Sequence, residues 1–260
     1  MPDFKLSGKR ALITGGSHGI GLAIAHKLAD EGVSVALLSR NEQVLEKESE
    51  ILALKGVESI FLSCDVQSVE EVNNAWEKLI EVWGGVDILI NNVGGGGRWG
   101  SENFLDTSLQ VWDEVFRKNA GVATQLTKLA VPKMMENNWG RVITITSIYG
   151  EKIGGRPWFN VAKVAQATLM KNLARNQNYA RSGITFNAIA PGSIQIPDTG
   201  WATLKDCDPP TFLKFTEDLP LGRLGTPEEV ANLTVFVCSP LASYLNGASI
   251  TIDGGESKDL

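Results

Sequence analysis

A glycine-rich stretch near the start of the chain has the spacing that phosphate binding requires. It reads TGGSHGIG at 14–21, between a short apolar segment and a helical one. Its glycines allow a sharp turn, a close approach of backbone to a pyrophosphate, and packing of the new helix on the strand. The alternative is a tight turn without a ligand, but the position at the opening of a strand–helix unit favours a dinucleotide site. The predicted phosphate-binding residues are Gly15, Ser17, His18, Gly19, Ile20 and Gly21.

The end of the second apolar segment indicates which dinucleotide binds. A site for NAD usually places a carboxylate here to hold the ribose 2′-hydroxyl. This chain has Ser39 followed by Arg40 instead. An arginine binds a 2′-phosphate with two hydrogen bonds, whereas a carboxylate repels it, and His18 adds partial positive charge nearby. We therefore predict NADP(H) in preference to NAD(H); the alternative is that Arg40 is a solvated residue at a strand end.

Arginine and tryptophan recur in two glycine-rich stretches, GGGGRWG at 94–100 and GGRPWF at 154–159. Such residues around one cleft suit a substrate with a flat or apolar body and an anionic group, because a guanidinium binds carboxylate or phosphate in bidentate fashion. The alternative is that these arginines lie on the surface and pair with local acids. The predicted substrate residues are Arg98, Trp99, Tyr149, Arg156, Trp158 and, in a later segment, Trp201.

Composition excludes several classes of function. The only two histidines, His18 and His26, are too few for most zinc sites or a Ser-His-Asp triad, so no metal site is predicted. A net charge of −6 without a basic run argues against nucleic acid. The apolar runs are strand-sized, and the N-terminus lacks an apolar segment of signal-peptide type, so no membrane partner is expected. The scattered Cys64, Cys207 and Cys238 predict reduced thiols in a cytoplasmic protein.

Short apolar segments alternate with helical ones along the whole chain. This pattern predicts an α/β fold: a single-domain, Rossmann-like, doubly wound and mostly parallel seven-stranded sheet with helices on both faces. No linker or repeat divides residues 1–260, so we expect one dinucleotide-binding and catalytic domain. The predicted strands are 10–14, 33–38, 59–63, 86–91, 142–146, 185–189 and 249–252. The predicted helices are 20–31, 42–54, 69–83, 108–136, 158–179 and 227–238.

The segment 192–222 interrupts this alternation. It is rich in proline, aspartate and threonine, and it follows a predicted strand. Ligands of open α/β sheets bind at the carboxyl edge of the strands, where such an excursion would lie. We therefore predict that this segment is a substrate lid.

These motifs, in this order, resemble those of the short-chain dehydrogenase/reductase family over nearly the whole chain. The stretch at 14–21 resembles the family's TGxxxGxG loop, and NNVG at 91–94 resembles its NNAG motif. APG at 190–192 resembles the turn beside the nicotinamide, and IDGG at 252–255 the closing strand. The resemblance implies further cofactor contacts from Asp65, Val66, Asn91, Val93, Gly94, Lys163, Pro191, Gly192 and Ile194.

The resemblance also implies a catalytic group in which one member is missing. Ser147 lies where the family has its catalytic serine, Asn119 where it has a water-ordering asparagine, and Lys163 where a lysine binds the nicotinamide ribose. The family's YxxxK motif, however, is FNVAK here, so Phe159 stands where a tyrosine gives and takes the proton. Ile196 also stands where a threonine often follows the proline–glycine turn.

Loss of the phenol need not abolish hydride transfer. Positioned acid–base catalysis contributes about 10²–10⁴-fold, whereas orienting the reactants is worth roughly 7–11 kcal/mol. Tyr149, two residues after Ser147, is a candidate alternative donor; the alternative is that it lines the pocket or packs under the lid. A phenylalanine at 159 is also consistent with ordinary packing beside Trp158, or with a substitution introduced by an experimenter.

We therefore expect an NADP(H)-dependent oxidoreductase that acts on a carbonyl or secondary alcohol with an atypical proton donor. One alternative is a protein that binds NADP(H) for sensing without turnover. Another is a non-redox lyase or isomerase that uses Tyr149 or Lys163 as its base. The retained Ser147 favours catalysis, because cofactor binding alone does not need it. The helical stretches 108–136 and 158–179 resemble those through which family members pair, which implies a homodimer or homotetramer with a small-molecule substrate.

Overall fold

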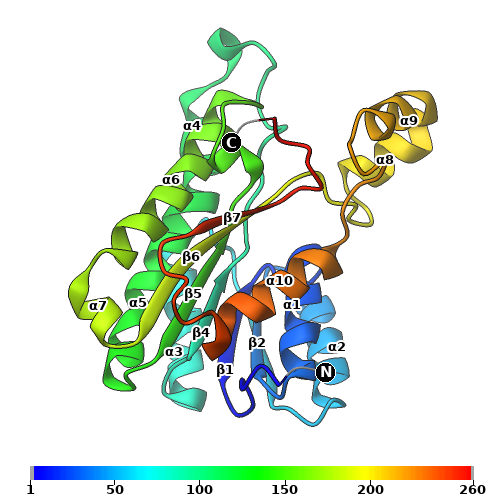
Figure 1. Cartoon of the computed structure of the whole chain (residues 1–260). Coiled ribbons are helices and arrows are strands. Elements are labelled where there is room, and N and C mark those ends of the chain that lie inside the picture. The colour runs from blue at the N-terminus through cyan, green and yellow to red at the C-terminus, as the bar shows by residue number, and fades with distance from the viewer. Residues whose placement is uncertain (1–2, 259–260) are drawn as a thin grey trace.

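The computed structural model describes residues 3–258 as a seven-stranded sheet with helices on both faces (Figure 1). All neighbouring strands are parallel, and their order is β3-β2-β1-β4-β5-β6-β7. The predicted fold class is confirmed, and the sheet is parallel throughout. The strands are β1 (Arg10–Thr14), β2 (Ser34–Ser39), β3 (Ser59–Ser63), β4 (Ile88–Asn91), β5 (Gly140–Ile145), β6 (Ile184–Pro191) and β7 (Ser249–Ile252).

Two layers of helices enclose the sheet. One layer is α1 (Gly19–Asp30), α2 (Glu42–Ala53) and α10 (Pro227–Cys238). The other layer includes α3 (Val69–Trp83), α4 (Leu109–Phe116), α5 (Val122–Glu136), α6 (Pro157–Ala174) and α7 (Gln177–Arg181). Within residues 3–258, no helix combines the length and the apolar character that a membrane crossing requires.

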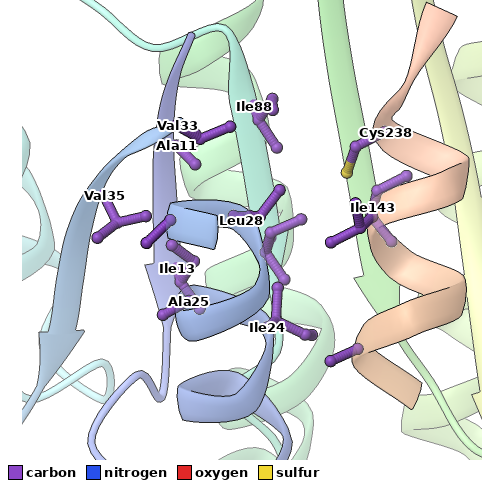
Figure 2. Close-up of a cluster of buried hydrophobic side chains, with 14 of the residues drawn as sticks. Ala11, Ile13, Ile24, Ala25, Leu28, Val33, Val35, Ile88, Ile143 and Cys238 are labelled. Atoms are coloured by element: carbon purple, nitrogen blue, oxygen red, sulfur yellow. The ribbon is translucent and has the colours of Figure 1, made fainter. Parts of the chain in front are cut away.

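The alternation of side chains along each strand supplies both cores. Ala11 and Ile13 of β1 belong to the core shared with α1 and α10, whereas Leu12 belongs to the core shared with α3 and α5. Figure 2 shows Ile24 and Leu28 on the α1 face that is turned toward α10. Because β1, β2, β4, β5 and β6 are covered on both faces, the sequence shows continuous apolar runs there rather than an alternating pattern.

The predicted helix 108–136 is interrupted near its middle, which corrects that expectation. Helix α4 ends at Phe116, and Arg117–Gly121 forms a π-helical turn before α5 begins. In a regular helix the carbonyl of Val115 accepts from the backbone N–H of Asn119. Here the Asn119 side-chain Nδ2 donates to that carbonyl at 2.7 Å. A side chain inserted into the backbone ladder in this way widens the turn.

The predicted helix 158–179 also divides. Helix α6 ends at Ala174, and the short α7 follows after a break. Asn176 causes the restart, because its side-chain oxygen accepts from the backbone N–H groups of Asn178 and Tyr179 and so caps a new helix.

The segment 192–222 forms two short helices, α8 (Gly200–Cys207) and α9 (Pro209–Glu217). They project away from the sheet at the upper right of Figure 1. The ring of Trp201 on α8 stacks on Phe215 of α9, with centroids 4.4 Å apart and planes 26° apart. The predicted lid is thus a helical hairpin rather than an irregular loop.

Candidate active site

A cavity of about 1000 Å³ lies at the carboxyl ends of the strands. It includes the crevice between β1 and β4, where the strand order reverses, which is the usual ligand site of an open α/β sheet. Most of the predicted site residues line it. These are Gly15, Ser17, His18, Gly19, Ile20, Ser39, Arg40, Asp65, Val66, Val93, Gly94, Arg98, Trp99, Ser147, Phe159, Lys163, Pro191, Gly192, Ile194 and Trp201.

The glycine loop has the form of a phosphate cradle. Gly15 and Gly19 take φ values of 68° and 57°, which favour glycine. His18 is the N-cap of α1, and its side chain makes no capping hydrogen bond; the first turn of α1 holds no acidic residue. The first backbone N–H groups of α1 and its positive dipole end are therefore left for an anion. These features fit a dinucleotide pyrophosphate.

Gly21 does not line the cavity and instead allows α1 to pack on the loop. A Cβ atom at this position would collide with the carbonyl oxygen of Gly15. We expect Gly21→Ala to weaken dinucleotide binding at least tenfold and to destabilise the fold by roughly 1–3 kcal/mol, the usual cost of overpacking. A fluorescence titration with NADPH and a thermal melt measure the two effects.

Gly16→Ala is the matched control for that substitution. A Cβ at Gly16 would press on Leu37 Cδ2, at 2.8 Å, in the core behind the loop, and not on the carbonyl of Gly15. We expect near-normal NADPH binding from this variant. Equal binding by the Gly21 and Gly16 variants would contradict the packing role of Gly21.

The two asparagines of the NNVG motif have different roles, and this corrects one prediction. Asn91 does not line the cavity; it is 2% exposed, and its Nδ2 donates to the hydroxyls of Thr127 and Thr144. Asn92 lines the cavity, and its Nδ2 donates to the carbonyl of Thr14 at 2.9 Å. The first asparagine therefore ties β4 to its neighbours, and the second holds the glycine loop in place.

A serine, a lysine and the unexpected phenylalanine share one part of the wall. The Ser147 hydroxyl accepts from the backbone N–H of Tyr149 at 3.2 Å. Nζ of Lys163 donates to the carbonyl of Ile145 at 3.2 Å and lies 5.6 Å from the ring centroid of Phe159. Burial lowers the pKa of Lys163 to about 7. The site thus holds a lysine that titrates near neutrality beside a phenyl ring.

Asn119 lies directly behind this wall. Its side chain accepts from the N–H of Gly95 at 3.2 Å and donates to the Gly95 carbonyl at 2.9 Å. A Cβ at Gly94 would come within 2.8 Å of Asn119 Oδ1 and 2.9 Å of Lys163 Nζ. The main-chain carbonyl of Asn119 accepts from Gln166 Nε2 at 3.2 Å. Asn119 therefore fastens the loop after β4 against the lysine.

Tyr149 and Arg156 do not line the cavity, contrary to prediction. A Cβ at Gly154 would collide with the ring of Tyr149, so this ring packs against the loop that precedes α6. Nη1 of Arg156 donates to the carbonyls of Trp99 and Gly100, each at 2.8 Å. Both residues brace loops around the site.

Trp158, which was predicted to contact the substrate, does not line the cavity either. It is 1% exposed and packs with Val115 and Ala162, and its Nε1 donates to the carbonyl of Gly96 at 3.3 Å. Trp158 and Phe159 are neighbours on α6, and one residue turns a helix by about 100°. This turn places Phe159 at the cavity and Trp158 in the core.

Some lining residues were not predicted. Lys118 is the most informative, because its Nζ lies 4.7 Å from the ring centroid of Trp99. Burial, and then the charge of Arg40, lowers the pKa of Lys118. The sequence offered a signal for Asn92, which is part of the NNVG motif, and none for Lys118. The unpredicted lining residues are Asn41, Val44, Cys64, Gln67, Asn92, Gly95, Lys118, Ile145, Thr146, Ile196, Thr199 and Gly200.

Known proteins similar to this chain are oxidoreductases. A family model described as "Enoyl-(Acyl carrier protein) reductase" matches residues 15–257. The 3-oxoacyl-[acyl-carrier-protein] reductase FabG of Aquifex aeolicus is 36% identical over 97% of this chain and 99% of its own. Dehydrogenase/reductase SDR family member 4 of Bos taurus is 33% identical over 98% of this chain and 89% of its own.

Solved structures of similar proteins agree with these matches. L-sorbose reductase from Gluconobacter frateurii, in complex with NADPH and L-sorbose, has a TM-score of 0.91 and 34% identity, with 100% of both chains covered. A 7α-hydroxysteroid dehydrogenase in complex with NADH and 7-oxo glycochenodeoxycholic acid has a TM-score of 0.87 and 31% identity, with 99% of this chain and 98% of that one covered. On these matches, the chain belongs to the short-chain dehydrogenase/reductase family of oxidoreductases.

Proposed function

We propose that this protein is an NADP(H)-dependent oxidoreductase of a ketone or secondary alcohol that works without a phenol at position 159. The observation that carries the proposal is that Ser147 and Lys163 line the same cavity as the glycine loop. When bound, the dinucleotide supplies or accepts the hydride. Ser147 offers a hydroxyl to the substrate oxygen, and Lys163 offers a proton on Nζ at neutral pH and below.

The preference for a phosphorylated dinucleotide rests on positive charge. Arg40, Lys118 and His18 line the cavity, and Ser39 stands where a carboxylate would hold an unphosphorylated ribose. An arginine binds a phosphate with parallel hydrogen bonds, and a second cation strengthens the attraction. The structure of L-sorbose reductase contains NADPH, whereas that of the hydroxysteroid dehydrogenase contains NADH. The proposed preference for NADP(H) therefore rests on the charges of this chain's own residues.

We expect Arg40→Ala to raise the Kd for NADPH at least tenfold and to leave the Kd for NADH within about twofold. A hydrogen bond to a charged group is worth about 1.5–3 kcal/mol, and only NADPH carries the 2′-phosphate. Fluorescence titration of both cofactors measures the ratio. Arg181→Ala removes the same charge from an exposed site on α7 and serves as control. Equal weakening of both cofactors by Arg40→Ala would contradict the assignment.

The substrate proposed here is a ketone with a flat or apolar body and an anionic group. Trp99, Trp201 and Phe159 line the cavity, and Arg98 joins them. The Arg98 guanidinium lies against Gly200 at the start of α8, since a Cβ there would overlap it. Arg98 thus sits between the loop after β4 and the proposed lid, where it would meet a substrate carboxylate or phosphate.

The direct test follows NADPH oxidation with a panel of ketones, each neutral compound paired with its carboxylated analogue. We expect slow turnover that is faster with the carboxylated member. Phe159 favours one other candidate, a protein that binds NADP(H) for sensing, because a phenyl ring cannot exchange a proton. Tight NADPH binding without turnover of any ketone would support that candidate and would overturn the oxidoreductase.

Assembly into a homodimer or homotetramer and a cytoplasmic location are also proposed. Apolar side chains on α4 and α6 support the assembly: Phe116, Val161 and Val164 are 47%, 49% and 42% exposed. The free thiols of Cys64, Cys207 and Cys238 support the location. Sedimentation equilibrium tests the assembly.

A further inference from the structure

A second cavity, of about 350 Å³, lies at the amino ends of the strands, whereas the candidate active site lies at their carboxyl ends. Arg141 and Thr185, each the second residue of its strand, place it at the amino ends of β5 and β6. Trp139, Ser243 and Asn246 also line it, and none of its lining residues is acidic. The proposed reaction does not use this cavity.

Arg141 is a buried charge without a carboxylate. It is 3% exposed, and among residues 3–258 no acidic side chain lies within ion-pair distance of it. Its Nη1 donates to the carbonyls of Gly140 and Gly183 at 2.8 and 3.0 Å, and its guanidinium lies 4.6 Å from the ring centroid of Trp139. Its Nε is buried, with no hydrogen-bond partner among the residues that the structure describes. Buried charges in proteins are usually paired, because desolvation of an unpaired one is costly.

The nearby charges do not neutralise Arg141. Asp87, which precedes β4, is engaged elsewhere: its carboxylate accepts from Lys9 Nζ at 3.4 Å and from the backbone N–H of Arg10 at 3.0 Å. Nζ of Lys9 lies 4.2 Å from the ring centroid of Trp139, so two cations share that ring. This part of the protein is therefore positive, although the whole chain has a net charge of −6.

Thr185 adds an unused hydroxyl to the same wall. Its Oγ1 is buried and finds no hydrogen-bond partner in the described part of the chain, and the residue is 6% exposed. The amide of Asn246 already has a partner on each side, since its oxygen accepts from the N–H of Phe186 and its nitrogen donates to the carbonyl of Ala174. The buried groups left without a partner on this wall are thus Nε of the Arg141 guanidinium and the Thr185 hydroxyl, and donors of these two kinds suit an oxyanion.

We propose that this second cavity binds a small oxyanion, a carboxylate or phosphate group, through Arg141 and Thr185. The guanidinium supplies the charge, and the Thr185 hydroxyl donates the accompanying hydrogen bond. The volume lies at the low end of small-molecule pockets, which span about 300–1,000 Å³. A compact anion therefore fits, and this site is independent of the proposed oxidoreductase activity.

The test uses thermal unfolding of the whole protein with saturating NADP⁺, so that added anions cannot report on the glycine loop. Inorganic phosphate and acetate are the probes, and chloride at equal ionic strength is the control. A ligand that binds only the folded state raises Tm by about 3–6 °C at a tenfold excess over Kd. A rise with phosphate alone assigns phosphate chemistry, and a rise with acetate assigns carboxylate chemistry. Equal effects of all three salts would overturn the site.

Variants separate binding from folding. Arg141→Met is expected to abolish the anion-dependent shift. Thr185→Val removes an unpartnered hydroxyl at constant shape, so its Tm without anion should equal or exceed that of the wild type, while its anion Kd rises at least fivefold. This second variant decides the matter even if Arg141→Met fails to fold. Lys128→Met makes the same charge change on the exposed face of α5 and should retain the shift. A full shift in Thr185→Val would reject the proposal.

Discussion

Phe159→Tyr is expected to raise the rate of NADPH-dependent ketone reduction by tenfold or more. The ring of Phe159 lines the cavity together with Ser147, and its centroid lies 5.6 Å from Lys163 Nζ. Tyrosine keeps the shape of this ring and adds a hydroxyl that can give the substrate oxygen a proton. A positioned acid contributes about 10²–10⁴-fold to rate. Steady-state kcat and kcat/KM at saturating NADPH measure the gain, which should appear mainly in kcat.

Two further variants decide how to interpret that result. Phe236→Tyr makes the same chemical change on α10, away from the cavity, and should leave the rate unchanged. Tyr149→Phe should also leave it unchanged, because the Tyr149 ring packs against Gly154 and does not line the cavity. If Tyr149→Phe abolished turnover while Phe159→Tyr gave no gain, Tyr149 would be the proton donor and the proposed geometry would be wrong.

Lys163→Met should reduce turnover by two or more orders of magnitude and, in the cofactor-free protein, increase stability below about pH 7. Lys163 lines the same cavity as Ser147, so its loss removes the charge and the proton that it offers there. Its burial also carries a folding cost, because desolvation lowers the pKa of Lys163 from 10.5 to about 7. Methionine fills a similar volume without that cost.

The pH dependence follows from this lowered pKa. Between about pH 7 and 10.5 the unfolded chain keeps a proton on Lys163 that the folded protein has lost, so wild-type stability from this group rises with pH. Below pH 7 burial of the charged lysine lowers the free energy of unfolding by its full amount, on the order of 3–5 kcal/mol. The stability advantage of Lys163→Met should therefore be largest below pH 7 and shrink steadily toward pH 10.5.

Urea denaturation of the cofactor-free proteins across this pH range measures the difference. Lys128→Met, an exposed lysine on α5, provides the matched control and should show a small, nearly constant effect. A stability difference for Lys163→Met that did not vary with pH would show that Lys163 titrates normally in the folded state. Full activity in this variant would remove Lys163 from the proposed site.

Strand positions and the glycine loop were predictable because each depends on local pattern. Buried parallel strands need continuous apolar runs, and a phosphate turn needs glycine at fixed spacing. The side-chain directions at element ends were less predictable. Asn91 and Asn92 are adjacent, but Asn91 bonds to Thr127 on α5 and Asn92 to the glycine loop. Trp158 and Phe159 are likewise separated by one helical step. If the boundary of a helix or strand is predicted one residue too early or too late, the residue assigned to the cavity and its buried neighbour exchange places.

Other features depend on contacts between distant parts of the chain. Lys118 reaches the cavity from a π-helical turn that the Asn119 side chain produces, and no periodicity in the sequence reports that turn. Arg156 donates to the carbonyls of Trp99 and Gly100, more than fifty residues earlier in the chain. Hydrogen bonds between such distant segments can be seen only in the folded structure. The prediction relied on the local motif alone and therefore assigned Arg156 to the substrate wall.

Helices α8 and α9 pack against each other as a hairpin. The stack of Trp201 on Phe215 joins them side by side, and Asp208, the residue between them, caps α9 by accepting from the N–H of Thr211 at 3.2 Å. After α9, Gly222 adopts a left-handed φ of 67°, which favours glycine. We expect these contacts to make the proposed lid move as one unit, which would carry Trp201 away from the cavity together with both helices.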